Sequence, residues 1–315
     1  MFDQFITLMV NHHELFYITI FFIALVVGSF LNVVIHRLPT MMEKEWLCQC
    51  KELLAEEAAQ STHKSDQQAK EQEQELAEQP EQEVYNLSVP RSACPKCNHQ
   101  IKAIENIPLV SYLFLRGKCS NCSAPISIRY PLVELLTAIL SVVVAMVFGP
   151  ELKTLLYIGT TWALIALALI DFDTMFLPDE ITVPLLWAGL LASSVGLTIA
   201  PSEAIVGASV GYLSLWSVYW LFKTFTGKEG MGFGDFKLMA VFGALLGWQS
   251  VLLIVFMSSV VGTVFTVITL VLGDKSKDTK IPFGPYIAVA GWISMLWGEQ
   301  MIRYYLDNYV NMNQL

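Results

Sequence analysis

The sequence predicts an all-α polytopic membrane protein with about eight transmembrane helices and a small cytoplasmic zinc-ribbon-like domain. Three observations support this fold class. Of the 315 residues, 54% are hydrophobic and only 15% are charged, which leaves too little charge to cover a soluble protein of this length. Long apolar runs recur along the chain. Two closely spaced cysteine pairs stand in a polar segment between the first two of these runs.

The apolar runs predict membrane-spanning helices, because a helix needs about 20 apolar residues to cross the hydrocarbon core. The predicted helices cover residues 15–35, 130–149, 153–170, 181–199, 203–222, 236–249, 251–272 and 282–302. The run 236–249 is short and rich in glycine and alanine, so we expect it to be tilted or to pack deep inside the bundle. The first run is too long for the apolar part of a cleavable signal peptide, and we expect it to be the first spanning helix.

The lysines and arginines predict the orientation in the membrane. If the N-terminus is outside, the inner segments 36–129, 223–237 and 274–281 contain 17 of the 19 basic residues. Only Lys153 and Arg303 then fall outside. Because cytoplasmic loops carry an excess of positive charge, we expect a periplasmic N-terminus and a cytoplasmic segment 37–129.

The chain is expected to divide into three parts: a first transmembrane helix (1–36), a cytoplasmic domain (37–129) and a transmembrane core (130–315). An acidic insertion at 41–88 accounts for most of the net charge of −9, with twelve carboxylates and four lysines between Glu43 and Glu83. We expect the insertion to be solvated and partly helical; a docking role for a secretion partner is the alternative. The sequence has no basic stripe with interleaved aromatic residues, so it gives no indication of a nucleic-acid partner.

Residues 90–125 are expected to form a zinc module. Two C-x2-C pairs separated by 21 residues make it up: Cys94 and Cys97, then Cys119 and Cys122. This spacing is typical of four thiolates around one zinc ion, and a cytoplasmic location disfavours disulfides. Four protein ligands leave no position for a substrate, so the zinc would be structural; a thiol switch or a site without its metal is the alternative. Cys48 and Cys50 are expected to be reduced thiols outside the module, and His99 to be an ordinary surface residue.

Four aspartates lie where predicted helices meet the cytoplasm: Asp171, Asp173, Asp179 and Asp235. A carboxylate at the membrane boundary is costly to desolvate, so each is a functional candidate. Two facing carboxylates that share a proton can activate a water molecule and protonate a leaving amine. Asp171 directly follows an apolar run, Asp173 would point away if the helix continues, and Asp179 resembles the N-cap of the next helix. We therefore pair Asp171 with Asp235; the alternative is that all four are caps or loop charges.

Glycines accompany these aspartates. Gly232 and Gly234 precede Asp235, and they would allow close backbone approach and unusual dihedral angles, so that an extended substrate strand could lie alongside. The segment Gly28-Ser-Phe-Leu-Asn32 is explained either by substrate contact or by close helix packing. The segment Pro282-Phe-Gly-Pro285 is explained by helix initiation at proline.

The ordered set of motifs resembles that of the type IV prepilin leader peptidases, which are aspartyl proteases of the GxGD class. The motifs cover nearly the whole chain: Gly28 to Pro39, the four cysteines, Glu105-Asn-Ile-Pro108, Arg129 to Glu134, Ile170 to Asp179, and Gly232-Phe-Gly234-Asp235. The resemblance implies that Asp171 and Asp235 are catalytic and that the substrates are prepilins or pseudopilins, cut after a glycine at the cytoplasmic face. It also implies N-methylation of the new N-terminus with S-adenosylmethionine, and Gly117 and Glu134 are carried over as methyl-transfer residues.

The resemblance further implies a location in the bacterial inner membrane and partners in the pilus or type II secretion machinery. Peptidase activity without methyl transfer is one alternative. A transporter would place its carboxylates near the middle of the bilayer, whereas these lie at one face. A metalloprotease would need histidine ligands such as H-E-x-x-H, and a membrane scaffold with a zinc module would not need two facing aspartates.

Overall fold

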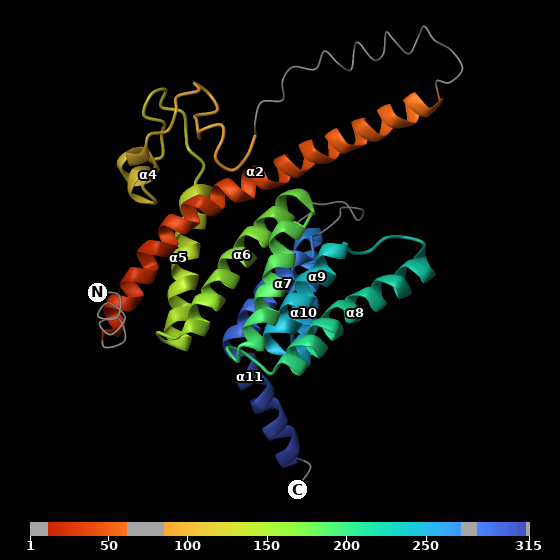
Figure 1. Cartoon of the computed structure of the whole chain (residues 1–315). Coiled ribbons are helices and arrows are strands. Elements are labelled where there is room, and N and C mark those ends of the chain that lie inside the picture. Colours follow the sequence, from red (N-terminus) through yellow and green to blue (C-terminus); the bar gives the residue numbers. More distant parts are fainter. Residues whose placement is uncertain (1–11, 62–84, 272–281, 313–315) are drawn as a thin grey trace. The chain divides into compact units, whose positions relative to one another are not determined.

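The computed structural model describes residues 12–61, 85–271 and 282–312, and these residues are mostly helical (Figure 1). The helices are α2 (His13–Ser61), the 3-10 helix η1 (Ala103–Asn106), α4 (Val110–Phe114), α5 (Arg129–Phe148), α6 (Leu152–Thr174), α7 (Asp179–Ser194), α8 (Pro201–Thr226), α9 (Phe233–Leu246), α10 (Trp248–Val271) and α11 (Gly284–Met312). Within the described ranges there is no β-strand, only two isolated bridges. The predicted all-α class is confirmed.

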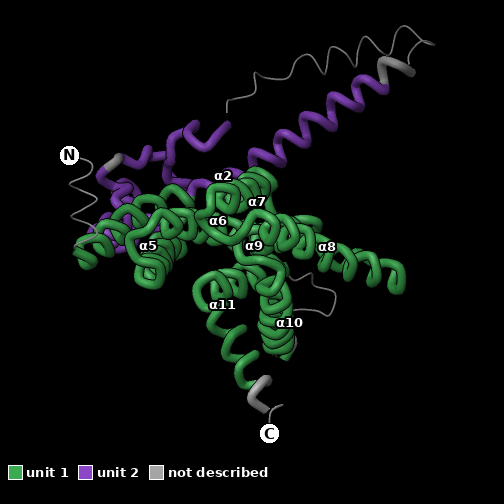
Figure 2. The backbone as a smooth tube through the Cα atoms, turned by 60° about the horizontal axis from the view of Figure 1, so that its bottom comes forward, with its two compact units in different colours: residues 1–32, 128–315 green, residues 33–127 purple. Residues whose placement is uncertain are grey.

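The chain forms two compact units (Figure 2): residues 1–32 with 128–315, and residues 33–127. Helix α2 begins in the first unit and ends in the second, so it continues well beyond the expected end of the first spanning helix at residue 36. The first part of the acidic insertion is therefore helical up to Ser61. Residues 62–84 of the insertion and the basic loop 274–281 lie outside the described residues.

Five of the described helices are long and apolar enough to cross a membrane: His13–Glu57 of α2, α5, α6, α8 and the part Trp248–Thr269 of α10. Each of the eight predicted spans coincides with a helix. By length and apolar composition, however, only five of the described helices qualify as membrane spans. Helices α7 and α9 contain only 16 and 14 residues, and α11 ends in a polar segment that includes Glu299, Arg303 and Asp307. The chain is a membrane protein with an apolar helical core.

Helix α9 is the centre of the first unit. It contacts α7, α8, α10 and α11, and every residue from Leu238 to Leu245 is buried. A helix that is apolar all round belongs in a core, where each of its faces has a partner. The expectation that this short run packs deep inside the bundle is confirmed. Asp235 lies in the first turn of this buried helix.

Helices α8 and α9 approach each other backbone to backbone. A Cβ atom added to Gly207 would overlap the carbonyl oxygen of Gly243, and one added to Gly243 would overlap that of Gly207. One helical turn further along α8, a Cβ atom on Gly211 would lie 2.5 Å from the carbonyl oxygen of Met239. Small residues allow this close contact between apolar helices, where van der Waals packing drives association.

We expect Gly243→Ala to destabilise the protein by about 1–3 kcal/mol or more, because neither backbone can move away from the added methyl group without separating α8 from α9. Thermal unfolding in detergent measures the change. Gly159→Ala in α6 is the matched control, since a Cβ atom there meets no atom within 4 Å. Equal melting temperatures for the two variants would contradict the packing role of Gly243.

Helix α2 packs closely on α5 at the start of the Gly28-Ser-Phe-Leu-Asn32 segment. A Cβ atom on Gly28 would lie 2.8 Å from the Cα atom of Glu134, and the side-chain amide of Asn32 donates to the backbone carbonyl of Tyr130 over 3.1 Å. Of the two explanations for this segment, close helix packing accounts for both Gly28 and Asn32.

Candidate active site and metal centre

Asp171 lies in the last turn of α6 and is 5% exposed. The helix continues to Thr174 and ends at Met175, which adopts a left-handed conformation with φ of 58°. The Oδ2 atom of Asp171 accepts a hydrogen bond from the backbone N–H of Gly284 over 3.0 Å. A carboxylate buried in an apolar bundle is thus held by the first residue of α11.

Asp235 lies in the first turn of α9 and is 6% exposed. Its Oδ2 atom lies close to Gly232, the N-cap residue, since a Cβ atom on Gly232 would be 3.8 Å from it. The carboxylate lies close enough to Asp171 for the two to interact electrostatically. Within the described part of the chain, the Oδ1 atom of Asp235 is buried and has no hydrogen-bond partner. Buried polar atoms almost always have a partner, so this oxygen is open to a water molecule or a substrate.

The other two boundary aspartates form ion pairs at the edge of the bundle. Arg129 binds Asp173 with two hydrogen bonds of 3.0 and 2.5 Å, and Lys237 binds Asp179 with two of 2.7 and 2.6 Å. The expectation that Asp179 is an N-cap is wrong, because α7 begins at Asp179 and its N-cap is Pro178. The structure therefore separates two exposed aspartates in ion pairs from two buried ones.

Gly234 lies in a close contact with the side chain of Leu177, whereas the expected approach of a substrate strand stays a prediction. A Cβ atom there would lie 2.6 Å from the Cβ atom of Leu177, in the turn between α6 and α7. The expected unusual dihedral angles do not occur: neither Gly232 nor Gly234 has a positive φ. The glycine at 234 is required by space, because it lets the start of α9 reach the turn that follows Asp171.

The sequence analysis missed two residues at this site, Gly284 and Leu177. Leu177 is buried between the starts of α9 and α11, since Cβ atoms on Gly234 and Gly284 would each meet its side chain. A glycine between two prolines at a helix start was a signal for Gly284, because proline alone explains helix initiation but not the glycine.

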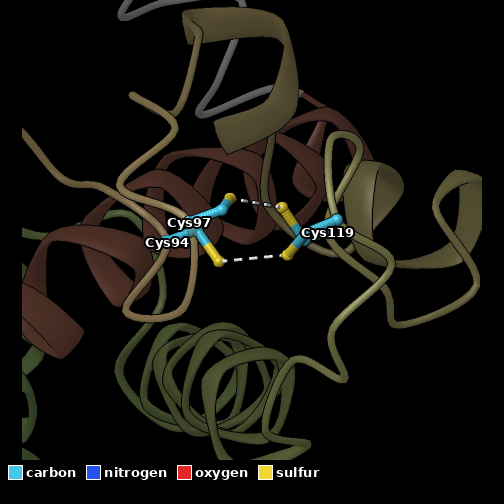
Figure 3. Close-up of side chains that lie close together, drawn as sticks. Cys94, Cys97 and Cys119 are labelled. Carbon is cyan, nitrogen blue, oxygen red and sulfur yellow. Dashed lines mark hydrogen bonds between the residues drawn. The ribbon is translucent and has the colours of Figure 1, made fainter.

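The second unit brings the four predicted metal ligands together. Their Sγ atoms all lie within 4.8 Å of one another. Cys94 and Cys122 are 3.8 Å apart and Cys97 and Cys119 are 3.9 Å apart, each pair joining one C-x2-C turn to the other (Figure 3). Tetrahedral zinc with Zn–S bonds of about 2.3 Å places its sulfur ligands about 3.8 Å apart. The cluster fits a zinc ion.

The two cysteine turns have the same backbone construction. Antiparallel bridges close them at Ala93 with Gln100 and at Lys118 with Pro125. The residue after each pair, Asn98 or Ser123, has a positive φ of 54° or 55°. Backbone N–H groups of Lys96 and Cys97 lower the pKa of the Cys94 thiol, and that of His99 lowers the pKa of Cys97. At these two cysteines the donors favour the thiolate form that binds metal, whereas the neighbouring thiols raise the pKa of Cys122.

Glu105 connects the two turns. The Ser120 hydroxyl and the backbone N–H of Lys102 lower the pKa of Glu105 to about 2. The Nε2 atom of His99 lies 3.4 Å from its carboxylate. His99 is therefore half-buried beside an acidic partner, and the expectation of an ordinary surface residue is wrong.

The two residues carried over for methyl transfer lie in different units. Gly117 has a φ of 68°, and a Cβ atom there would lie 2.9 Å from the hydroxyl of Tyr112. Glu134 is 8% exposed where α5 meets Gly28. The contact with Gly28 involves the Cα atom and the carbonyl oxygen of Glu134, so it explains the glycine and not the glutamate side chain. Cys48 and Cys50 lie on α2 and are not part of the described cysteine cluster.

Comparison with known proteins gives a consistent picture along the chain. The profile of the bacterial peptidase A24 N-terminal domain matches residues 22–148, and that of the type IV leader peptidase family matches residues 158–267. The chain is similar to proteins named prepilin leader peptidase/N-methyltransferase. It is 50% identical to the one from Aeromonas salmonicida over 93% of this chain and 94% of that protein. It is 50% identical to the one from Pseudomonas aeruginosa (94% and 96%) and 40% identical to the one from Legionella pneumophila (95% and 97%). No solved structure matches the chain.

Proposed function

Because this chain belongs to the type IV leader peptidase family, we propose that it removes the leader of type IV prepilins or pseudopilins and then N-methylates the new N-terminal residue. The observation that carries the peptidase proposal is the division among the boundary aspartates. Asp173 and Asp179 are neutralised by Arg129 and Lys237, whereas Asp171 and Asp235 are buried together, and no lysine or arginine of the described residues pairs with them. Burying two carboxylates without a cationic partner is costly, and such groups typically occur at functional sites.

The proposed reaction uses the two carboxylates as one unit. One carboxylate removes a proton from a water molecule while the water oxygen attacks the scissile carbonyl carbon. The other carboxyl group donates its proton to the leaving nitrogen, so that the C–N bond breaks and a carboxylate and an amine are released. The open Oδ1 atom of Asp235 supports this proposal, since it offers a buried acceptor for the water.

The proposed orientation places the N-terminus in the periplasm and both the aspartates and the cysteines at the cytoplasmic side of the bacterial inner membrane. The distribution of basic residues supports this arrangement. The apolar helix of the substrate then enters from the bilayer while its basic leader stays in the cytoplasm. The scissile peptide must leave helical geometry so that its carbonyl reaches the two aspartates.

We further propose that the four cysteines hold a structural zinc ion, which would join the two cysteine turns of residues 90–125 and catalyse no step itself. S-adenosylmethionine would supply the methyl group for the new N-terminal amine. Assembly with the pilus or type II secretion machinery is the proposed context of the substrates.

Mass spectrometry of a prepilin co-expressed with this chain tests the function. We expect loss of the leader and gain of the mass of one methyl group on the mature N-terminus. A full-length prepilin beside well-expressed wild-type protein would contradict the peptidase proposal. A cleaved but unmethylated prepilin would support the proposed peptidase activity and contradict the proposed methyl transfer.

A further inference from the structure

The start of α11 reaches the buried Asp171, although the two segments are 113 residues apart in the chain. The backbone N–H of Gly284, the first residue of α11, donates to Oδ2 of Asp171 over 3.0 Å, and the bond is buried. The first N–H groups of a helix have no acceptor within the helix and carry partial positive charge. Pro285 follows and has no N–H, so Gly284 provides the donor at this end.

Space explains why residue 284 is glycine. A Cβ atom there would lie 2.6 Å from Oδ2 and 3.2 Å from Cγ of Asp171, and 3.1 Å from Cδ1 of Leu177. Gly284 does not have a positive φ, so its backbone conformation alone would accept other residues. A side chain at this position would push the carboxylate away from the place in which it accepts the hydrogen bond of Gly284.

We propose that Gly284 is a positioning residue of the peptidase: its N–H holds one oxygen of Asp171, and its missing side chain leaves room for that carboxylate. The proposal rests on the proposed function, in which Asp171 is catalytic. With Oδ2 held by α11, the other oxygen of Asp171 is directed to the water or to the proton shared with Asp235. Gly284 itself touches neither the water nor the substrate.

The test compares Gly284→Ala with wild type in cleavage assays on purified protein and a synthetic prepilin peptide. We expect kcat to fall on the order of 10- to 100-fold with KM unchanged, because a small displacement of a catalytic group impairs the transition state and not the binding of the leader. Gly298→Ala in the same helix is the matched control, since the nearest atom to its Cβ is 3.4 Å away, an ordinary contact. It should retain wild-type kcat and KM.

A second variant separates positioning from folding. Glycolic acid in place of Gly284 replaces the backbone N–H with an ester oxygen and adds no side chain, so it removes the hydrogen bond alone. It should also lower kcat on the order of 10-fold, the worth of one hydrogen bond to a charged group. Wild-type kcat in the ester variant would overturn the proposal, whether or not Gly284→Ala folds.

Asp171→Asn is measured beside these variants to separate the two levels of the argument. If Asp171→Asn is inactive and the ester variant is fully active, the positioning role of Gly284 is contradicted and the catalytic role of Asp171 is supported. If Asp171→Asn is active, both the catalytic role of Asp171 and the positioning role of Gly284 are contradicted.

Discussion

Asp171→Asn and Asp235→Asn are each expected to lower the rate of prepilin cleavage on the order of 1000-fold or more, while the protein still inserts and folds. Asparagine keeps the size of the side chain and can still accept a hydrogen bond, so the N–H of Gly284 keeps a partner in Asp171→Asn. It cannot take a proton from water or hold the shared proton. Single-turnover cleavage of a prepilin by purified protein, with thermal unfolding in detergent to verify the fold, measures the effect.

The controls are Asp173→Asn and Asp179→Asn, which change the same functional group at the same membrane boundary. Both aspartates are exposed and pair with Arg129 and Lys237, so their loss removes a surface ion pair worth about 0–1 kcal/mol. We expect both controls to cleave at close to the wild-type rate. A substantially active Asn variant at 171 or 235 would contradict the assignment of the catalytic pair.

Cys94→Ser and Cys119→Ser are each expected to abolish zinc binding. One sulfur ligand is lost from a four-ligand site, and the binding energy of a structural zinc, about 10–16 kcal/mol in small zinc modules, is also folding energy. The zinc content of purified protein should fall from one ion per chain to none, and limited proteolysis should cut within residues 90–125. Leader cleavage should persist, because neither proposed catalytic aspartate lies in the unit that contains the cysteines.

Cys48→Ser and Cys50→Ser provide the matched controls for the zinc site. Both residues lie on α2, outside the cluster of four sulfur atoms, so these variants should keep one zinc ion and resist proteolysis like wild type. Stoichiometric zinc in Cys94→Ser, or loss of zinc in Cys48→Ser, would contradict the four-cysteine site.

The helical fold could be predicted from the sequence because apolar runs of membrane length leave the backbone no other way to satisfy its hydrogen bonds. The pairing of Asp171 with Asp235 was predicted from depth in the membrane, and in the structure both side chains are buried and close enough to interact electrostatically. The geometry of the cysteine cluster followed from ligand spacing, since two short turns place four sulfur atoms around one point.

Other features depended on tertiary contacts that local patterns do not contain. The continuation of α2 to Ser61 passes through Pro39, a residue that usually ends or bends a helix. The role of Gly284 depends on α11 meeting α6, and that of Gly234 on Leu177. The space available to Gly117 is likewise limited by a contact, with Tyr112.

The most direct test of the peptidase assignment is a double-mutant cycle on single-turnover cleavage with Asp171→Asn, Asp235→Asn and the double variant. Groups that act as one unit are strongly non-additive, so the double variant should be no slower than the slower single variant. Losses that multiply in the double variant would show that the two carboxylates act independently, and would contradict a shared water and proton.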